Sequence, residues 1–170
     1  MNATPISFRR RSIRLRDYDY AQQGAYFVTM CTQLRECFFD VPATRQIAEQ
    51  SWIEIPQHFP GVELDEWIVM PNHVHAIILI AAVQPSQKRD AESRFSRISP
   101  NKRTLSVIVR TYKAAVTTQC RQAGEIEFTW QRNYYERIIR NAAELNTVRQ
   151  YILDNPTKWD EDVENPKRTL

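Results

Sequence analysis

In the first half of this chain, hydrophobic and polar positions form patterns that are typical of β-strands. A β-branched and aromatic run over residues 26–32 predicts a central strand, entered at Gly24. Residues 62–70 roughly alternate apolar and acidic positions, and a Pro-Asn turn then leads into an apolar run that begins at His73. Because the turn is so short, these two segments predict an antiparallel hairpin.

Apolar residues at helical spacing predict one helix from Pro42 to about His58 and a second from about Leu105 to Gln122. Gly124 closes the second helix. Residues 127–130 and 134–139 read as one or two short strands. The polar stretch from about 82 to 100 predicts a mobile loop.

The last helix has the clearest local signals. Asn141 predicts its N-cap and Glu144, three residues later, its capping-box partner, while Pro156 predicts its end. An apolar stripe runs along it, formed by Leu145, Val148 and Ile152. The element order β-α-β-β-α-β-α predicts an α+β fold, the ferredoxin-like split βαβ with an antiparallel sheet and an extra C-terminal helix.

Length and composition predict one soluble domain over residues 23–160, between a basic arm (1–22) and a polar tail (161–170). The 170 residues are 42% hydrophobic and 25% charged, with no apolar run long enough to span a membrane. The three cysteines are odd in number and lack metal-site spacing, so a reducing cytoplasm is expected.

The distribution of charge along the chain is more informative about function than the net charge of +3. Basic residues gather in the N-terminal arm and over residues 88–103, whereas acidic residues gather over 160–164. Clustered cations on flexible segments suit a phosphate backbone. An ordinary solvated surface explains the same pattern equally well.

Two of the three histidines, His73 and His75, stand one residue apart at the start of the apolar strand. In a strand, residues i and i+2 point to the same face, so both imidazoles project together. Paired neutral imidazoles form half of a divalent-metal site. The alternative is a pair of polar residues at a strand edge with ordinary hydrogen bonds.

The last helix offers a second pair, Tyr151 and Asn155, which share a face because they are four residues apart. Asn155 precedes a proline, which favours a non-helical backbone there. A phenol beside an amide oxygen suits a nucleophile next to a hard-cation ligand. Taken singly, Tyr151 also fits a packing role and Asn155 a helix terminator.

Three ordered segments, Met70–His75, Trp130–Arg140 and Tyr151–Trp159, resemble the single-tyrosine HUH transposases, most closely the REP-associated tyrosine transposases. Residues 24–29 resemble that group's first strand. The resemblance extends from about Arg14 to Trp159, and asparagine at position 155 replaces the glutamine of many relatives.

The resemblance implies that His73, His75 and Asn155 hold Mg²⁺ or Mn²⁺ and that Tyr151 is the catalytic nucleophile. The implied reaction nicks and rejoins hairpin-bearing single-stranded DNA, of the REP type, through a covalent 5′-phosphotyrosine. It also implies a bacterial, nucleoid-associated protein in the cytoplasm, without membrane contact, acting as a monomer or homodimer. Tyr134 and Tyr135 lie in another motif, where packing or base stacking is expected.

The candidate DNA contacts are basic residues of the arm and of the second helix region: Arg9, Arg10, Arg11, Arg14, Arg103, Arg110 and Lys113. Two other functions remain open. One is a nucleic-acid-binding module of the same fold without catalysis. The other is a metal-dependent hydrolase that uses the histidines with a nearby acid, namely Glu63, Asp65 or Glu66.

Overall fold

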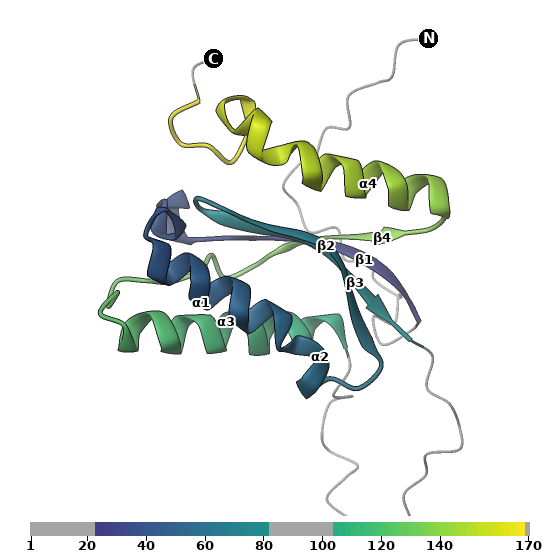
Figure 1. The fold of residues 1–170 in the computed structure, drawn as a ribbon, viewed down its shortest axis with the longest axis horizontal. Coiled ribbons are helices and arrows are strands. Elements are labelled where there is room, and N and C mark those ends of the chain that lie inside the picture. The colour runs from purple at the N-terminus through teal and green to yellow at the C-terminus, as the bar shows by residue number, and fades with distance from the viewer. Residues whose placement is uncertain (1–22, 82–103, 169–170) are drawn as a thin grey trace, which may run out of the picture.

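The computed structural model describes residues 23–81 and 104–168. The predicted arm (1–22) and the predicted loop (about 82–100) lie outside these residues. Four strands form one antiparallel sheet in the order β2-β3-β1-β4 (Figure 1). They are β1 (Gly24–Cys31), β2 (Val62–Met70), β3 (His73–Ile80) and β4 (Tyr135–Ile139). This order confirms the ferredoxin-like fold, with β1 and β3 as the central strands.

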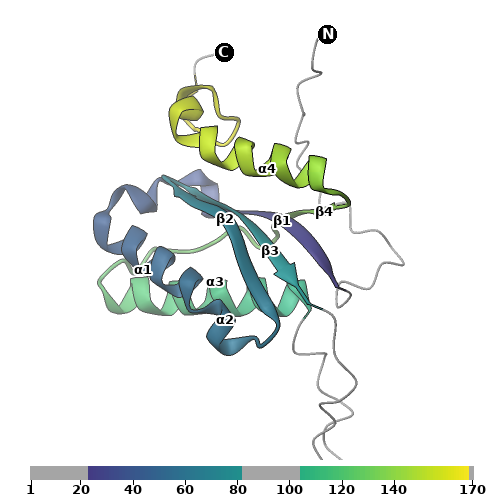
Figure 2. The ribbon, with the colours of Figure 1, turned by 45° about the vertical axis from the view of Figure 1, so that its right-hand side comes forward.

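Helices cover both faces of the sheet, as Figures 1 and 2 show. Helices α1 (Pro42–Ile53) and α3 (Leu105–Gln122) pack on one face, and α4 (Ala142–Asp154) packs on the other. The central strands are therefore buried on both sides, which explains why β3 is apolar without alternation.

Each face has its own apolar core. The larger core includes Tyr26, Val28 and Ile78 beneath α1 and α3. The smaller core joins Phe27 and Ile77 to the stripe on α4. Strand register places the odd-numbered residues of β1 and β3 on the α4 face, with Phe27 opposite Ile77, Thr29 opposite His75 and Cys31 opposite His73. Both histidines consequently face α4.

The predicted helix from Pro42 to His58 is in fact two helices. Helix α1 ends at Ile53, and a separate turn, α2 (Ile55–His58), follows. Pro56 explains the break, because it has no N–H to donate and its ring clashes with the carbonyl four residues earlier. The other strand predicted before β4 is reduced to one bridge between Trp130 and Thr32.

The end of α4 also differs from expectation. Pro156 does not stop the chain from coiling: α4 ends at Asp154, and a 3₁₀ helix (Asn155–Glu161) continues from it. Asn155 keeps helical dihedral angles (φ −57°, ψ −41°), so the non-helical conformation expected before proline is wrong. This continuation turns the following residues back toward the start of β3.

The predicted N-cap of α4 is present. The Asn141 side-chain oxygen accepts a hydrogen bond from the Glu144 backbone N–H at 2.8 Å. The Glu144 carboxylate accepts in turn from the Arg140 N–H, one residue before the cap, at 2.9 Å. Both bonds use donors that would otherwise lack partners at the helix start.

None of the three cysteines forms a disulfide in the part of the chain that the structure describes. Within the same residues, no helix is both long enough and apolar enough to cross a membrane.

Candidate metal and tyrosine centre

His73 and His75 lie side by side at the start of β3, with their ring centroids 4.3 Å apart. Both side chains are buried, at 0% and 3% exposure. Burial lowers the pKa of His75 to about 3, and burial together with the neighbouring His75 lowers the pKa of His73 well below its usual value. Both imidazoles are therefore neutral near pH 7, which is the form that binds metals.

Asn72 determines which nitrogen of His73 is protonated. Its side-chain N–H₂ donates to the backbone oxygens of Arg35 (3.0 Å) and Glu164 (2.7 Å), so its side-chain oxygen is an acceptor. That oxygen lies 2.8 Å from His73 Nδ1 and therefore accepts from an Nδ1–H. The lone pair of His73 is then on Nε2, which is buried and has no hydrogen-bond partner among residues 23–81 and 104–168.

His75 has partners on both ring nitrogens. Its Nδ1 lies 2.8 Å from the Thr29 hydroxyl, and its Nε2 lies 3.3 Å from the Tyr151 hydroxyl. Both contacts are satisfied when the ring donates from Nδ1 to Thr29 and accepts from Tyr151 at Nε2. In that tautomer His75 presents its Nε2 lone pair toward α4, as His73 does.

Tyr151 reaches the histidines from the last turn of α4. Its ring packs edge-on against Phe27 and lies 5.2 Å from the His75 ring, centroid to centroid. Burial, followed by the charge of Asp162, raises the pKa of the Tyr151 hydroxyl, and a hydrogen bond from Asn155 opposes this shift. The hydroxyl is therefore protonated at neutral pH and needs assistance before it can act as a nucleophile.

Asn155 is the remaining residue of the site that the sequence predicts, beside His73, His75 and Tyr151. It is buried, and its side-chain oxygen has no hydrogen-bond partner in the part of the chain that the structure describes. An unpaired buried amide oxygen costs free energy, of order 1–3 kcal/mol, unless a ligand satisfies it. The Asn155 side-chain oxygen and His73 Nε2 are thus two buried acceptors on the α4 side of the sheet. A cation would be a partner for both.

Asp162 is a further member of this site that the sequence reasoning missed. One ligand atom from each of His73, His75 and Asp162 lies within 4.8 Å of the others, and the Asp162 carboxylate is 3.9 Å from His73 Nε2. The acidic run over 160–164 was the available signal, but it was read only as charge.

Residues 161–168, assigned from sequence to a polar tail, hold Asp162 in place. Glu164 is buried, its backbone oxygen accepts from Asn72, and its carboxylate pairs with Arg35 at 3.2 Å. The same carboxylate accepts from the Cys31 thiol at 3.4 Å. The segment is therefore attached to both β1 and the turn before His73.

A bidentate ion pair fixes α4 over the sheet. Arg149 donates from Nε and Nη2 to the two carboxylate oxygens of Asp65 on β2, at 2.7 and 2.6 Å. Arg149 lies two residues before Tyr151, so the pair also limits how far the tyrosine can move from β3. Asp65 is thereby occupied, which counts against its use as an acid beside the histidines.

The donor set fits a divalent cation. Two neutral imidazole nitrogens, one carboxylate and one amide oxygen are ligands for Mn²⁺ and similar metals, and two of the four donor atoms have no other partner among the described residues. The Tyr151 hydroxyl lies beside this donor set, in contact with His75.

The other candidate residues lie elsewhere. Arg110 and Lys113 are on α3, on the opposite face of the sheet from the histidines. Arg9, Arg10, Arg11, Arg14 and Arg103 lie outside the described residues. Tyr135 faces α4 and packs against Phe27, with ring centroids 6.3 Å apart, whereas Tyr134 packs against the larger core.

Known proteins resemble this chain in sequence and in fold. The chain is 39% identical over 165 residues to an uncharacterized protein of Haemophilus influenzae, an alignment that covers 90% of this chain and 91% of that protein. No family model matches the chain. A solved structure of a REP-associated tyrosine transposase bound to a REP hairpin aligns with a TM-score of 0.54 and 21% identity, over 90% of this chain and 73% of the other. This chain therefore belongs to one family with the Haemophilus influenzae protein, and it has the transposase fold that its motifs predicted.

Proposed function

We propose that this protein is a metal-dependent tyrosine transposase, a nickase and strand transferase that acts on hairpin-bearing single-stranded DNA. The observation that supports this most directly is the position of the Tyr151 hydroxyl, 3.3 Å from His75 Nε2. A nucleophile, two neutral imidazoles and two oxygen donors thus meet at one place. The transposase fold agrees with this assignment, and the solved relative with that fold is bound to a REP hairpin.

Four side chains would hold the cation: His73, His75, Asn155 and Asp162. A bound Mg²⁺ or Mn²⁺ would polarise the scissile phosphate and offset the negative charge that grows on its oxygens. Asn72 orients the His73 ring and Thr29 orients the His75 ring, each by a hydrogen bond to the Nδ1 atom of the histidine. Metal-binding histidines commonly have such a partner on the nitrogen that does not bind the metal.

Tyr151 would carry out the covalent step. Its oxygen forms a bond to phosphorus, the bond from phosphorus to the 3′ oxygen breaks, and the products are a 5′-phosphotyrosine and a free 3′-hydroxyl. The tyrosine loses its proton and the leaving 3′ oxygen gains one, so the step needs no oxidant or nucleotide cofactor. Attack by another 3′-hydroxyl on the phosphotyrosine reverses the step and joins new DNA.

The arrangement of the centre supports a monomer that acts in cis, because Tyr151 contacts the His75 of its own chain. Mixing Tyr151→Phe with His73→Ala tests this point. Restored cleavage in the mixture would indicate instead a homodimer in which each tyrosine serves the partner's histidines. We place this activity in the bacterial cytoplasm, in association with the nucleoid.

The experiment that tests the proposal is cleavage of end-labelled, hairpin-bearing single-stranded DNA of the REP type in Mg²⁺ or Mn²⁺. We expect a protein–DNA adduct on a denaturing gel with the wild type and none with Tyr151→Phe or His73→Ala. Tyr112→Phe is the matched control, since it removes a hydroxyl on the other face of the sheet, where it donates to the Ala48 backbone oxygen, and should leave the adduct.

Two outcomes would contradict the proposal. Cleavage without an adduct that survives Tyr151→Phe would indicate a metal-dependent hydrolase. Binding of hairpin DNA with no cleavage in either metal would indicate a non-catalytic binding module.

A further inference from the structure

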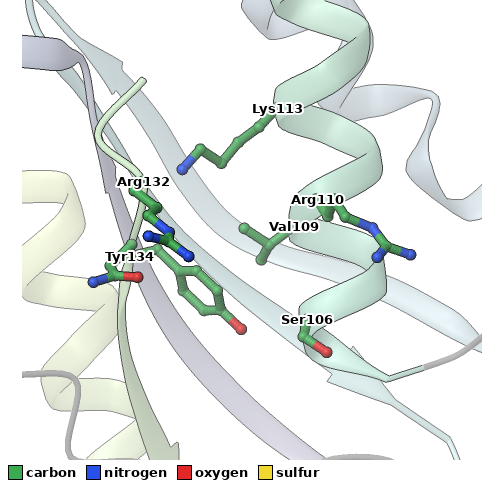
Figure 3. Close-up of a pocket in the computed structure, with 7 residues that line it drawn as sticks. Ser106, Val109, Arg110, Lys113, Arg132 and Tyr134 are labelled. Carbon is green, nitrogen blue, oxygen red and sulfur yellow. The ribbon is translucent and has the colours of Figure 1, made fainter. Parts of the chain in front are cut away.

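A pocket of about 500 Å³ lies on the sheet face opposite the histidines, between the N-terminal half of α3 and the segment that leads into β4. Figure 3 shows side chains from both walls around it. The α3 wall includes Ser106, Arg110 and Lys113, and the other wall consists of Arg132, Asn133 and Tyr134. Its volume lies within the range of small-ligand sites.

The lining is cationic and aromatic. It has three basic side chains, and no acidic residue of the described chain is among those that line it. Figure 3 shows the Tyr134 ring extending from the β4 side into the space toward α3, with Lys113 above it. Arg110 and Arg132 are both exposed; the Arg132 guanidinium lies beside the Tyr134 ring, whereas that of Arg110 points away from it across α3 (Figure 3). Cations beside an aromatic ring are the usual means of holding single-stranded nucleic acid.

Lys113 is fixed in the wall of the pocket. Its ammonium donates to the Gln131 backbone oxygen at 2.6 Å and lies 5.9 Å from the centre of the Trp130 ring. Burial removes water from the ammonium and lowers its pKa to about 8. A phosphate oxygen next to Lys113 would stabilise the charged form.

The Tyr134 side of the pocket lies close in strand register to the metal and tyrosine centre. Tyr135 at the start of β4 pairs with Thr29 of β1, and Thr29 pairs with His75. Tyr134 precedes Tyr135 and packs on the α3 face. Because β4 is an edge strand, a flexible single strand that passes around it could reach both the pocket and the centre.

We propose that this pocket binds one nucleotide of the single-stranded DNA, outside the segment that is cleaved, with its phosphate on Lys113 and Arg132 and its base against Tyr134. The inference rests on the proposed function, because it takes the same DNA as the ligand. It adds a binding site on the other face of the sheet and assigns roles to Arg132 and Tyr134.

The test is fluorescence anisotropy with a labelled single-stranded oligonucleotide that extends on both sides of a REP-type hairpin. All variants are made in a Tyr151→Phe background, so that cleavage does not alter the probe. We expect Tyr134→Ala to weaken binding about tenfold through lost stacking, and Tyr134→Phe to retain most of the affinity. Arg132→Ala should weaken binding and reduce the slope of log K against log salt by about 0.7, the value for one phosphate on a single strand.

Arg140→Ala is the matched control, because it removes the same charge from an exposed position at the far end of β4. If Arg132→Ala and Tyr134→Ala bind as Arg140→Ala does, the pocket is not a nucleotide site. Adduct formation by the enzyme with Tyr151 intact is scored separately. Normal adducts with unchanged binding by the pocket variants would overturn this inference alone, and weakened binding without any adduct would overturn the proposed function alone.

Discussion

Asn72 shows how a single residue can prepare a metal site. Its amide group donates to two backbone oxygens, one shortly after β1 and one in the C-terminal segment, and is thereby fixed in orientation. Its oxygen then holds the proton of His73 on Nδ1, which leaves the Nε2 lone pair free on the side of Asp162, 3.9 Å from its carboxylate. One side chain links the turn, the histidine and the segment that presents Asp162.

Asp162→Asn should reduce the affinity for Mn²⁺ by at least about tenfold, because it replaces a charged oxygen donor beside His73 Nε2 with a neutral amide. Isothermal titration calorimetry measures this directly. Asp160→Asn is the matched control: it removes the same charge from an exposed position in the same acidic run. Equal affinities for the two variants would show that Asp162 is not a ligand.

At the scale of elements, the position of α4 determines the distance between the tyrosine and the histidines. Two kinds of contact hold this helix. Val148 and Ile152 are buried in the smaller core, and Arg149 forms the bidentate pair with Asp65 on β2. The apolar contacts fix the height of the helix above the sheet, and the ion pair fixes its position along the strand.

The ion pair predicts a pH dependence. The hydrogen bond from Arg149 lowers the pKa of Asp65 in the folded protein. The ion pair therefore contributes its full stability above the pKa that Asp65 has in the unfolded chain, about 4, and this contribution is lost as pH falls through the lower pKa of the folded state. Asp65→Asn should lower the melting temperature by about 2 °C at pH 7, since partly exposed pairs contribute little. The difference from wild type should shrink below pH 4.

Thermal unfolding followed by circular dichroism from pH 2 to pH 8 measures this dependence. Glu63→Gln, an exposed change on the same strand, is the control and should follow the wild type throughout. A constant difference between Asp65→Asn and wild type at every pH would contradict the assignment.

In the whole molecule, the two faces of the sheet have different roles. The larger core beneath α1 and α3 supports the fold, whereas the face beneath α4 holds the buried His73 nitrogen and Asn155 oxygen, which have no partner among the described residues. A cation that satisfies them would bind only the folded chain, since the donors come from β3, the 3₁₀ helix after α4 and the segment that follows it. Metal binding should therefore stabilise the entire domain.

Mn²⁺ at a hundred times its Kd should add about 2.7 kcal/mol to the free energy of unfolding. For a chain of this length the melting temperature should then rise by about 5–10 °C, and EDTA should reverse the rise. Differential scanning calorimetry of wild type and His73→Ala tests this, with His58→Ala as control because His58 lies in α2, away from the centre. An equal rise in all three would indicate non-specific binding.

Local patterns were enough to predict most of the elements. The bounds of β2, β3 and α3 and the Asn141 cap agree with the structure, because periodicity, turns and caps depend on neighbours within a few residues. The break in the first helix was missed although Pro56 marked it. The expected geometry of Asn155 was wrong because a 3₁₀ helix continues from α4.

Local sequence patterns are enough to predict the order of the strands along the chain, the shared face of His73 and His75, and the four-residue spacing of Tyr151 and Asn155. These follow from periods of two and of about 3.6 residues. Tertiary packing, in contrast, brings Tyr151 to His75 and Asp162 back to His73, and it places Arg132 and Tyr134 across a pocket from Lys113. Those contacts join residues far apart in the chain, and only the packing of α3, α4 and the C-terminal segment on the sheet brings them together.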